Sequence, residues 1–274
     1  MLMFIRFSSC WVTATILSFG VITPAHSKIE MVTFGFPPYS MPAIDDKPIG
    51  PFVEIVNDVC VQLVISCEIG YWPNRRAKML VNTGQATAIF PMGWNKQRVS
   101  KYFFSVPIIV SEYGFFINKD AMQPIKSLSD LQNLTVAVFS PSNTFSSLLT
   151  LQQEIVKLGY KPFDIAEQTD ASEILIHLLD KNRVDAYYSN RDVGEFKAKT
   201  LGLGNITYSF NHRDVLYFIA FSKNYVSQDF IRRFNRSLLN YMSTNPNYYS
   251  ILLKYQLSPA PVTDEILDKY NILR

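Results

Sequence analysis

A single arginine stands on a short polar turn between two apolar stretches of the chain. The apolar run at 88–90 is broken at Pro91 and Gly93, the turn leads to Arg98, and an aromatic run at 103–104 follows and ends in Ser-x-Pro at 105–107. An arginine held on a loop between two buried strands can grip a carboxylate through two parallel hydrogen bonds. Arg98 is therefore a candidate anion anchor, although this stretch by itself fits a surface arginine in an ordinary turn better.

A second candidate anion contact lies further along, where the strand expected at 134–139 leads into a helix at 145–158. The connection carries Ser142, Asn143 and Thr144. Ser and Thr are natural helix caps, and the free N–H groups at a helix start also attract anions. These residues by themselves favour a capping role alone, and contact with an anionic ligand is the alternative.

The first 27 residues have the pattern of a signal peptide. Arg6 is their only Lys, Arg, Asp or Glu, an apolar run follows at 11–23, and the small residues Ala25 and Ser27 suit cleavage after Ser27. A retained membrane anchor is the alternative, but the apolar run is short for a span of about 20 residues. We therefore expect a soluble protein of the periplasm.

Removing residues 1–27 leaves 247 residues with 25 basic and 23 acidic side chains, which suits one large domain or two lobes. This near balance, without a long basic run, gives no reason to expect nucleic-acid binding. Aromatic residues make up 14% of the full chain. Many of them must form the core, and a surplus of aromatic residues often lines a cleft for an organic ligand.

Two cysteines, Cys60 and Cys67, remain after cleavage. An even count in an exported chain favours a disulfide, here between the end of a helix and the next strand; two buried free thiols are the alternative. His177 and His212 are the remaining histidines, and neither has a metal-ligand spacing with the cysteines. We expect neither a metal nor a cofactor.

The order of elements predicts an α/β protein. Apolar periodicity and turn residues place strands and helices alternately along most of the chain. The strands are expected at 29–34, 67–71, 111–118, 134–139, 183–190 and 215–221, and the helices at 52–64, 76–83, 145–158, 174–179 and 230–242. Such alternation predicts mainly parallel sheets with flanking helices, and two small alternating units predict two lobes joined by more than one crossing strand.

Taken together, these pieces resemble the family 3 periplasmic solute-binding proteins, the ligand-binding components of polar amino-acid ABC transporters. The resemblance covers nearly the whole mature chain and rests on the order and spacing of short motifs. The motifs lie at 35–39, 50–52, 76–84, 88–98, 105–107, 127–131, 135–138, 182–186 and 251–255. The spacing of Cys60 and Cys67 also looks like a disulfide of some histidine- and basic-amino-acid-binding members.

The resemblance implies a type II-like periplasmic-binding-protein fold with two α/β lobes around a ligand cleft. Lobe 1 would hold 28–117 plus 219–274, and lobe 2 would hold 118–218. Ligand would close the lobes by a hinge motion. The implied partners are a small carboxylate ligand and the membrane permease of an ABC transporter, and we expect a monomer.

Carried over by position, the family's ligand contacts fall on residues of both expected lobes. Arg98 matches the arginine that clamps the ligand's α-carboxylate, and Phe36, with Tyr39 nearby, matches an aromatic residue that packs on the ligand. The remaining candidates are cleft-lining Phe90, Met92 and Gly93, the helix start at Ser142, Asn143 and Thr144, the ammonium position Asn190, and a recurrent arginine, Arg76, whose role could equally be structural.

The chain departs from the family pattern at several of these positions. Asn190 stands where an aspartate usually grips the ligand's ammonium, and an amide brings no counter-charge, while Asp192 lies two residues on. Pro141 stands where glycine is common. These changes weaken the case for an amino acid as the ligand. They do not weaken the case for a small organic anion. Aromatic residues such as Trp94 and Tyr188 could favour a flat or apolar ligand, or belong to the core.

Three functions fit this pattern. The first is capture of a carboxylate-bearing solute for a transporter, and the second is a sensory module that binds a solute and contacts a receptor. The third is an enzyme, because some relatives are dehydratases of cyclohexadienyl carboxylates. The candidate cleft residues supply little proton-transfer chemistry near neutral pH, so we expect a protein that is not an enzyme.

Overall fold

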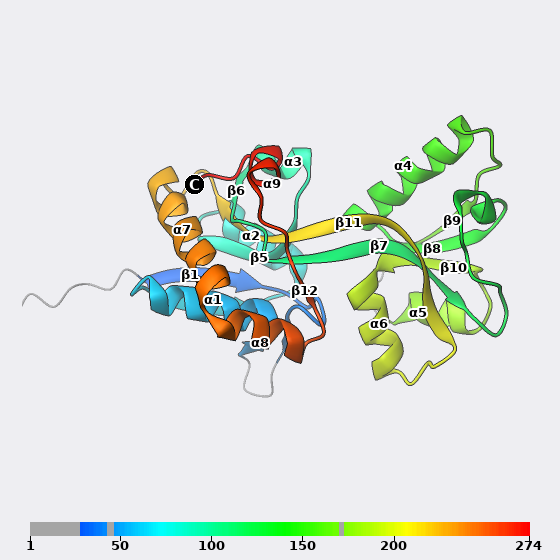
Figure 1. Ribbon diagram of the computed structural model, residues 1–274, viewed down its shortest axis with the longest axis horizontal. Helices are drawn as coiled ribbons and strands as arrows, with labels where there is room; N and C mark the ends of the chain where they lie inside the picture. Colours follow the sequence, from blue (N-terminus) through cyan, green and yellow to red (C-terminus); the bar gives the residue numbers. More distant parts are fainter. Residues whose placement is uncertain (1–27, 43–46, 170–172) are drawn as a thin grey trace, which may run out of the picture.

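The computed structural model of the protein describes residues 28–42, 47–169 and 173–274. The expected signal peptide at 1–27 and most of a helix cap expected at 170–173 lie outside these residues. Within them, no helix is both long enough and apolar enough to cross a bilayer. Figure 1 shows two groups of elements joined by a pair of long strands.

The first lobe is built on parallel strands, with β1 between β4 and β5. Its strands are β1 (Lys28–Thr33), β2 (Met41–Pro42), β3 (Pro48–Ile49), β4 (Ser66–Tyr71), β5 (Ala88–Gly93), β6 (Tyr102–Phe104) and β12 (Ser258–Pro259). Its helices are α1 (Pro51–Gln62), α2 (Asn74–Asn82), α3 (Lys96–Val99), α7 (Gln228–Thr244), α8 (Pro246–Lys254) and α9 (Asp264–Lys269). The last three helices return the chain to this lobe after the second lobe is complete (Figure 1).

Helix α1 illustrates why these elements form. Pro51 occupies its first turn, where a missing N–H is tolerated, and the apolar residues recur at helical spacing. Phe52, Ile55, Val56 and Val59 are completely buried. This stripe packs the helix into the core of the first lobe, against α7, α8 and β4.

The second lobe has its own set of parallel strands, with β8 between β10 and β9. It contains η1 (Leu128–Leu131), β8 (Thr135–Phe139), α4 (Asn143–Lys157), β9 (Asp164–Gln168), α5 (Ile174–Asp180), β10 (Ala186–Asn190) and α6 (Arg191–Thr200). Two apolar clusters form its core. One packs under α4 around Phe115 and Leu148, and the other packs under α5 around Phe116 and Ile176.

Two long antiparallel strands, β7 (Ile109–Asn118) and β11 (Ile206–Ser222), run through both lobes. Through them, the sheets of the two lobes join into one ten-stranded sheet. The mixed α/β fold and its crossing strands agree with the sequence-based expectation, but β11 begins well before the expected 215–221. Polar residues at 211–214 interrupt its apolar pattern because this part of the strand is exposed.

The two crossing strands contribute side chains to a different core in each lobe. Ile109 and Leu216 belong to the core of the first lobe, whereas Tyr113 and Phe210 pack with the second. Between Tyr208 and Arg213 the pairing of β11 with β7 shifts register twice. Such bulges bend and twist a strand, so β11 bends opposite residues 113–116 of β7, on the second-lobe side of the connection. The boundaries of the lobes at 117/118 and 218/219 remain a prediction.

The disulfide between Cys60 and Cys67 is present, as expected. It links the last turn of α1 to β4, and Cys60 is almost completely buried. The bridge closes a short loop and ties a helix of the first lobe to the edge strand of its sheet.

We expect the double substitution Cys60→Ser and Cys67→Ser to lower the free energy of unfolding by about 2 kcal/mol, because the unfolded chain regains the entropy of a short loop. Urea unfolding followed by circular dichroism measures this change. Unfolding of the wild type under reducing conditions should give a similar loss. An unchanged midpoint in both experiments would contradict a stabilising role for the bridge.

Candidate functional site

Arg98 lies in α3, directly after the end of β5, and its side chain is half-buried. Asn95 caps this short helix, since its Oδ1 accepts a hydrogen bond of 2.8 Å from the Arg98 backbone N–H. The guanidinium donates from Nη1 to the carbonyl oxygen of Gly93 at 2.5 Å. Backbone and side chain are thus both held at the end of β5.

No Asp or Glu of the described residues forms an ion pair with Arg98. Burial lowers the pKa of its guanidinium, while the nearby hydroxyls of Tyr113, Tyr217 and Tyr102 oppose this shift. An arginine keeps its proton under such conditions, so a partly desolvated cation remains without a carboxylate partner. This is the electrostatic condition in which an anionic ligand is attracted.

The two lobes meet next to Arg98. Asn95 of the first lobe donates from Nδ2 to Oδ1 of Asn143, the first residue of α4, at 2.9 Å. A Cβ atom at Gly93 would lie 3.1 Å from Nδ2 of Asn143 and 3.8 Å from Nη1 of Arg98. The glycine therefore permits the close approach of the second lobe, and it brings three of the expected site residues together.

The other residues at the start of α4 form its cap. Ser142 Oγ accepts a hydrogen bond of 2.9 Å from the Phe145 backbone N–H and donates to the Phe139 carbonyl at 2.6 Å. Thr144 Oγ1 lies 2.6 Å from the same Ser142 hydroxyl. Both hydroxyls thus have partners within the protein, and of these three residues Asn143 makes the contact to the first lobe.

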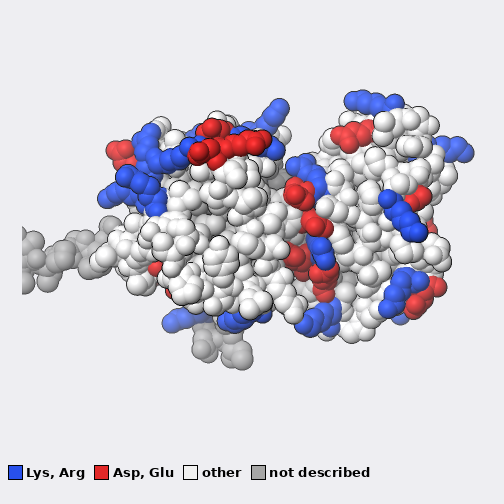
Figure 2. Space-filling view, viewed as in Figure 1, with Lys and Arg blue, Asp and Glu red and all other residues white. Residues whose placement is uncertain are grey.

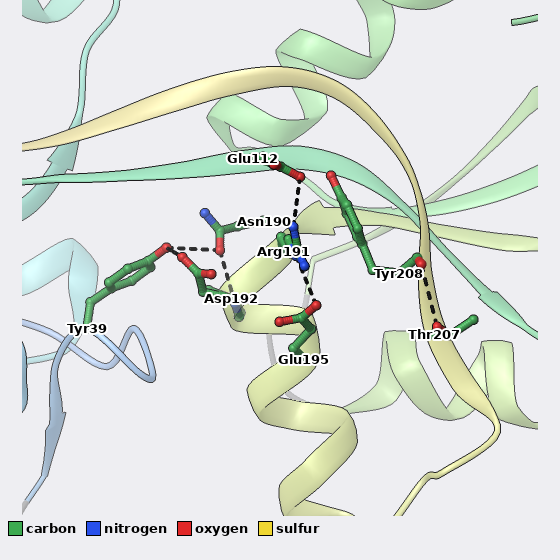
Figure 3. A network of polar contacts seen from close by, with 9 residues as sticks. Tyr39, Glu112, Asn190, Arg191, Asp192, Glu195, Thr207 and Tyr208 are labelled. Carbon is green, nitrogen blue, oxygen red and sulfur yellow. Dashed lines mark hydrogen bonds and ion pairs between the residues drawn. The ribbon is translucent and has the colours of Figure 1, made fainter. Parts of the chain in front are cut away.

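A second contact between the lobes is centred on Tyr39, which follows β1 and is completely buried. Its hydroxyl lies 2.6 Å from Oδ2 of Asp192 and 3.1 Å from Oδ1 of Asn190. Figure 3 shows Tyr39 reaching from the first lobe to these residues at the start of α6. Asn190 also caps α6 by accepting from the Val193 N–H at 3.0 Å, and its Nδ2 donates to the Tyr217 hydroxyl at 3.1 Å.

Asn190 is therefore 2% exposed, and both ends of its amide have partners inside the protein. Burial raises the pKa of the Asp192 carboxyl, whereas the hydrogen bond from Tyr39 lowers it. On the other side of the helix start, Arg191 pairs with Glu112 at 3.5 Å and with Glu195 at 3.0 Å (Figure 3). The charged groups of this helix start are thus largely satisfied within the protein.

The aromatic candidates divide between this contact and the core. Phe36 packs against Tyr39 and Tyr217, with ring centroids 5.2 and 5.6 Å away. Phe90 is completely buried and stacks on Phe52 in the core of the first lobe. Two expected site residues that are not aromatic lie elsewhere. Met92 lines a pocket beside Arg98. Arg76 is exposed, and its guanidinium lies 4.2 Å from the centre of the Trp72 ring.

The sequence left open whether Tyr188 and Trp94 line the cleft or belong to the core. In the structure both side chains pack within the lobes. Tyr188 is 1% exposed, and its hydroxyl lies 3.0 Å from Ser147 Oγ and 2.6 Å from Nδ1 of His212. Burial and Arg213 lower the pKa of His212 to about 4, so this histidine is neutral near pH 7. Trp94 is half-buried against Tyr270, with ring centroids 5.3 Å apart.

Solved structures share this architecture at low sequence identity. A histidine kinase sensor domain with similarity to periplasmic binding proteins aligns with a TM-score of 0.72 and 18% identity, over 86% of this chain and 99% of its own. The ancestral amino acid-binding protein AncCDT-1, a precursor of cyclohexadienyl dehydratase, aligns with a TM-score of 0.68 and 17% identity, over 83% and 94%. The chain has the fold of periplasmic binding proteins.

The substrate-binding protein of an amino acid ABC transporter aligns with a TM-score of 0.65 and 17% identity, over 83% of this chain and 98% of its own. No protein-family model matches the sequence, and no curated protein is significantly similar to it. The comparisons therefore confirm the periplasmic-binding-protein fold that the sequence motifs suggested. The individual ligand contacts carried over from the family remain a prediction.

Sequence reasoning missed several residues of this periplasmic-binding-protein fold that lie between the lobes. Tyr217 was assigned to an apolar strand without a separate role, and Asn95 was passed over as part of a polar turn. The helix start at Lys96 carried a usable signal, because an asparagine three residues before Arg98 is a favoured N-cap. Tyr217 carried no such signal, since its partners Asn190 and Tyr39 are distant in sequence.

We expect Tyr39→Phe to lower the free energy of unfolding by about 1–3 kcal/mol at pH 7, because Asp192 loses a buried hydrogen-bond donor. The variant should also raise the pKa of Asp192 above its wild-type value. Folding favours the protonated form of an acid whose pKa is raised, so stability is gained as the pH falls through that pKa. The gain on acidification should therefore be larger in Tyr39→Phe.

Urea unfolding between pH 7 and pH 4 measures both effects. Tyr71→Phe serves as the matched control, because Tyr71 lies on β4 of the first lobe and its hydroxyl forms no hydrogen bond with any described residue. Asp192→Asn should remove the difference in pH dependence between Tyr39→Phe and wild type. Identical pH profiles for wild type and Tyr39→Phe would contradict the link between Tyr39 and Asp192.

Proposed function

We propose that this chain is an extracytoplasmic solute-binding protein that captures a small carboxylate-bearing solute by closing its two lobes. The observation that carries the proposal is the half-buried Arg98, which stands beside the contact between the lobes without a carboxylate partner among the described residues. A guanidinium in this position can bind a carboxylate through charge-assisted hydrogen bonds. The neighbouring contact between Asn95 and Asn143 would couple that binding to the position of the second lobe.

The crossing strands support a closing motion. Two strands form the connection, and the register shifts of β11 lie on its second-lobe side, opposite residues 113–116 of β7. Packed lobes joined by a bent double strand can rotate as rigid bodies while a few backbone angles change. A ligand that contacts both lobes would stabilise the closed arrangement by its differential affinity for it.

Delivery of the solute to the permease of an ABC transporter is the first candidate role, and the similarity to the binding protein of an amino acid ABC transporter favours it. The second candidate is a sensory module, favoured by the alignment with a histidine kinase sensor domain. On the face in Figure 2, acidic and basic side chains alternate along the line between the lobes, so no large single-sign patch there indicates a partner. Either role needs the same ligand site.

Catalysis is the weakest of the three functions. A dehydratase needs an acid or base positioned at its substrate. The residues around Arg98 are amides, tyrosines, a glycine and the lysines Lys78 and Lys101, and no described carboxylate or histidine lines the pocket beside it. Asp192 hydrogen-bonds to Tyr39, and His212 to Tyr188. The proposal is therefore a protein that binds its ligand and releases it unchanged.

We expect Arg98→Ala to weaken ligand binding by roughly 2–5 kcal/mol, because the ligand carboxylate loses its charged partner. A thermal-shift screen of amino acids, small organic acids and aromatic carboxylates would identify ligands, since a ligand at 100 times its Kd adds about 2.7 kcal/mol of stability. Calorimetry then gives the affinities of wild type and variant.

Arg75→Ala is the matched control, because Arg75 is exposed on α2. It should bind every hit as wild type does. Ligands that bind Arg98→Ala with unchanged affinity would remove Arg98 from the site. A screen in which no carboxylate raises the melting temperature would contradict the proposed function.

A further inference from the structure

A pocket of about 500 Å³ lies in the first lobe between α2, the end of β5 and the segment that contains α3. Its charged lining residues are Lys78, Arg98 and Lys101, and no carboxylate lines it. Three cations around one pocket without an acid create a positive potential. The pocket therefore suits an anion with more than one negative charge.

Lys78 distinguishes this pocket from an ordinary basic surface. Its side chain is half-buried, and it makes no hydrogen bond or ion pair within the described part of the chain. Burial and the charge of Arg98 together lower the pKa of its amine. Two like charges that share a pocket and lack a counter-ion destabilise the ligand-free protein, and an anion placed between them would relieve this repulsion.

Neutral groups of the pocket are also hydrogen-bond donors. The Tyr102 hydroxyl lies 2.7 Å from Oδ1 of Asn82, and this bond leaves the amide nitrogen of Asn82 without a partner among the described residues. Carboxylate oxygens accept several such bonds. By contrast, a ligand ammonium would meet no acid here, because no carboxylate is among the described residues that line the pocket.

We propose that the ligand is an organic dianion with two carboxylates, one bound by Arg98 and the other by Lys78. This inference rests on the proposed function and narrows its ligand class. Lys101 is exposed at the rim of the pocket and adds to the potential without a fixed contact. Each carboxylate would supply the counter-ion that Arg98 or Lys78 lacks in the ligand-free protein.

The experiment compares C4–C6 straight-chain dicarboxylates with their monoamides by isothermal titration calorimetry of the purified protein. A monoamide keeps the size and shape of the diacid but has one charge fewer. At least one diacid should bind about tenfold or more tightly than its monoamide, since one charge-assisted hydrogen bond is lost. Inorganic phosphate, a dianion with its charges on one centre, should bind more weakly than that diacid.

The variant Lys78→Gln should bring the ratio of the two affinities close to one while the monoamide keeps its wild-type Kd. Lys96→Gln is the matched control, because Lys96 is an exposed lysine of α3 outside the pocket. It should leave both affinities unchanged. Because Lys78→Gln removes like-charge repulsion, the ligand-free variant should melt at or above the wild-type temperature, which separates lost recognition from a folding defect.

Three results would overturn the inference: equal affinity for diacid and monoamide, tighter binding of phosphate than of any diacid, or no binding of any diacid. These three results do not decide the proposed function, which the carboxylate screen and Arg98→Ala test separately. If monocarboxylates or amino acids bind and Arg98→Ala abolishes their binding, the solute-binding role stands and the two-carboxylate ligand fails. If no carboxylate binds, both fail.

Discussion

The antiparallel pairing of β7 and β11 is the constraint on which the rest of the structure depends. These two strands continue the sheet of each lobe, so each lobe gains a long strand for its own core and a connection to the other core. A pair of strands resists twisting more than one linker would, yet the register shifts of β11 allow it to bend on the second-lobe side of the connection. The positions of Arg98, Tyr39, Asn143 and Asn190 relative to one another follow from this connection.

Much of this arrangement could be predicted from the sequence, because local patterns determine it. Helix α1 has its apolar stripe, α4 has Ser142 at its cap, and the parallel strands are short apolar runs between turn residues. The two alternating units also predicted two lobes joined by crossing strands, and the resemblance to a known family then gave Arg98 its expected role as a carboxylate clamp. The extent of β11 could not be predicted, because its exposed middle segment has no apolar pattern and is held by pairing with β7.

The candidate site was harder to predict because its contacts join residues far apart in the chain. Asn190 illustrates this, since position alone placed it at a ligand ammonium, while its burial, its cap of α6 and its bond to Tyr217 require the folded protein. Lys78 was not predicted as a site residue. Nothing in its neighbourhood in sequence distinguishes it from a solvated lysine of a helix, and its significance arises from sharing a pocket with Arg98.

The interlobe acid and the cations of the pocket are kept apart, and this separation is a condition for binding anions. If Asp192 paired with Arg98, the cation would be neutralised within the protein and a ligand carboxylate would have to displace an internal partner. The Tyr39 hydroxyl instead holds Asp192 at the start of α6, and the Gly93 carbonyl holds Arg98 at the end of β5. Two neutral partners thus leave the positive charge of Arg98 available to an incoming anion.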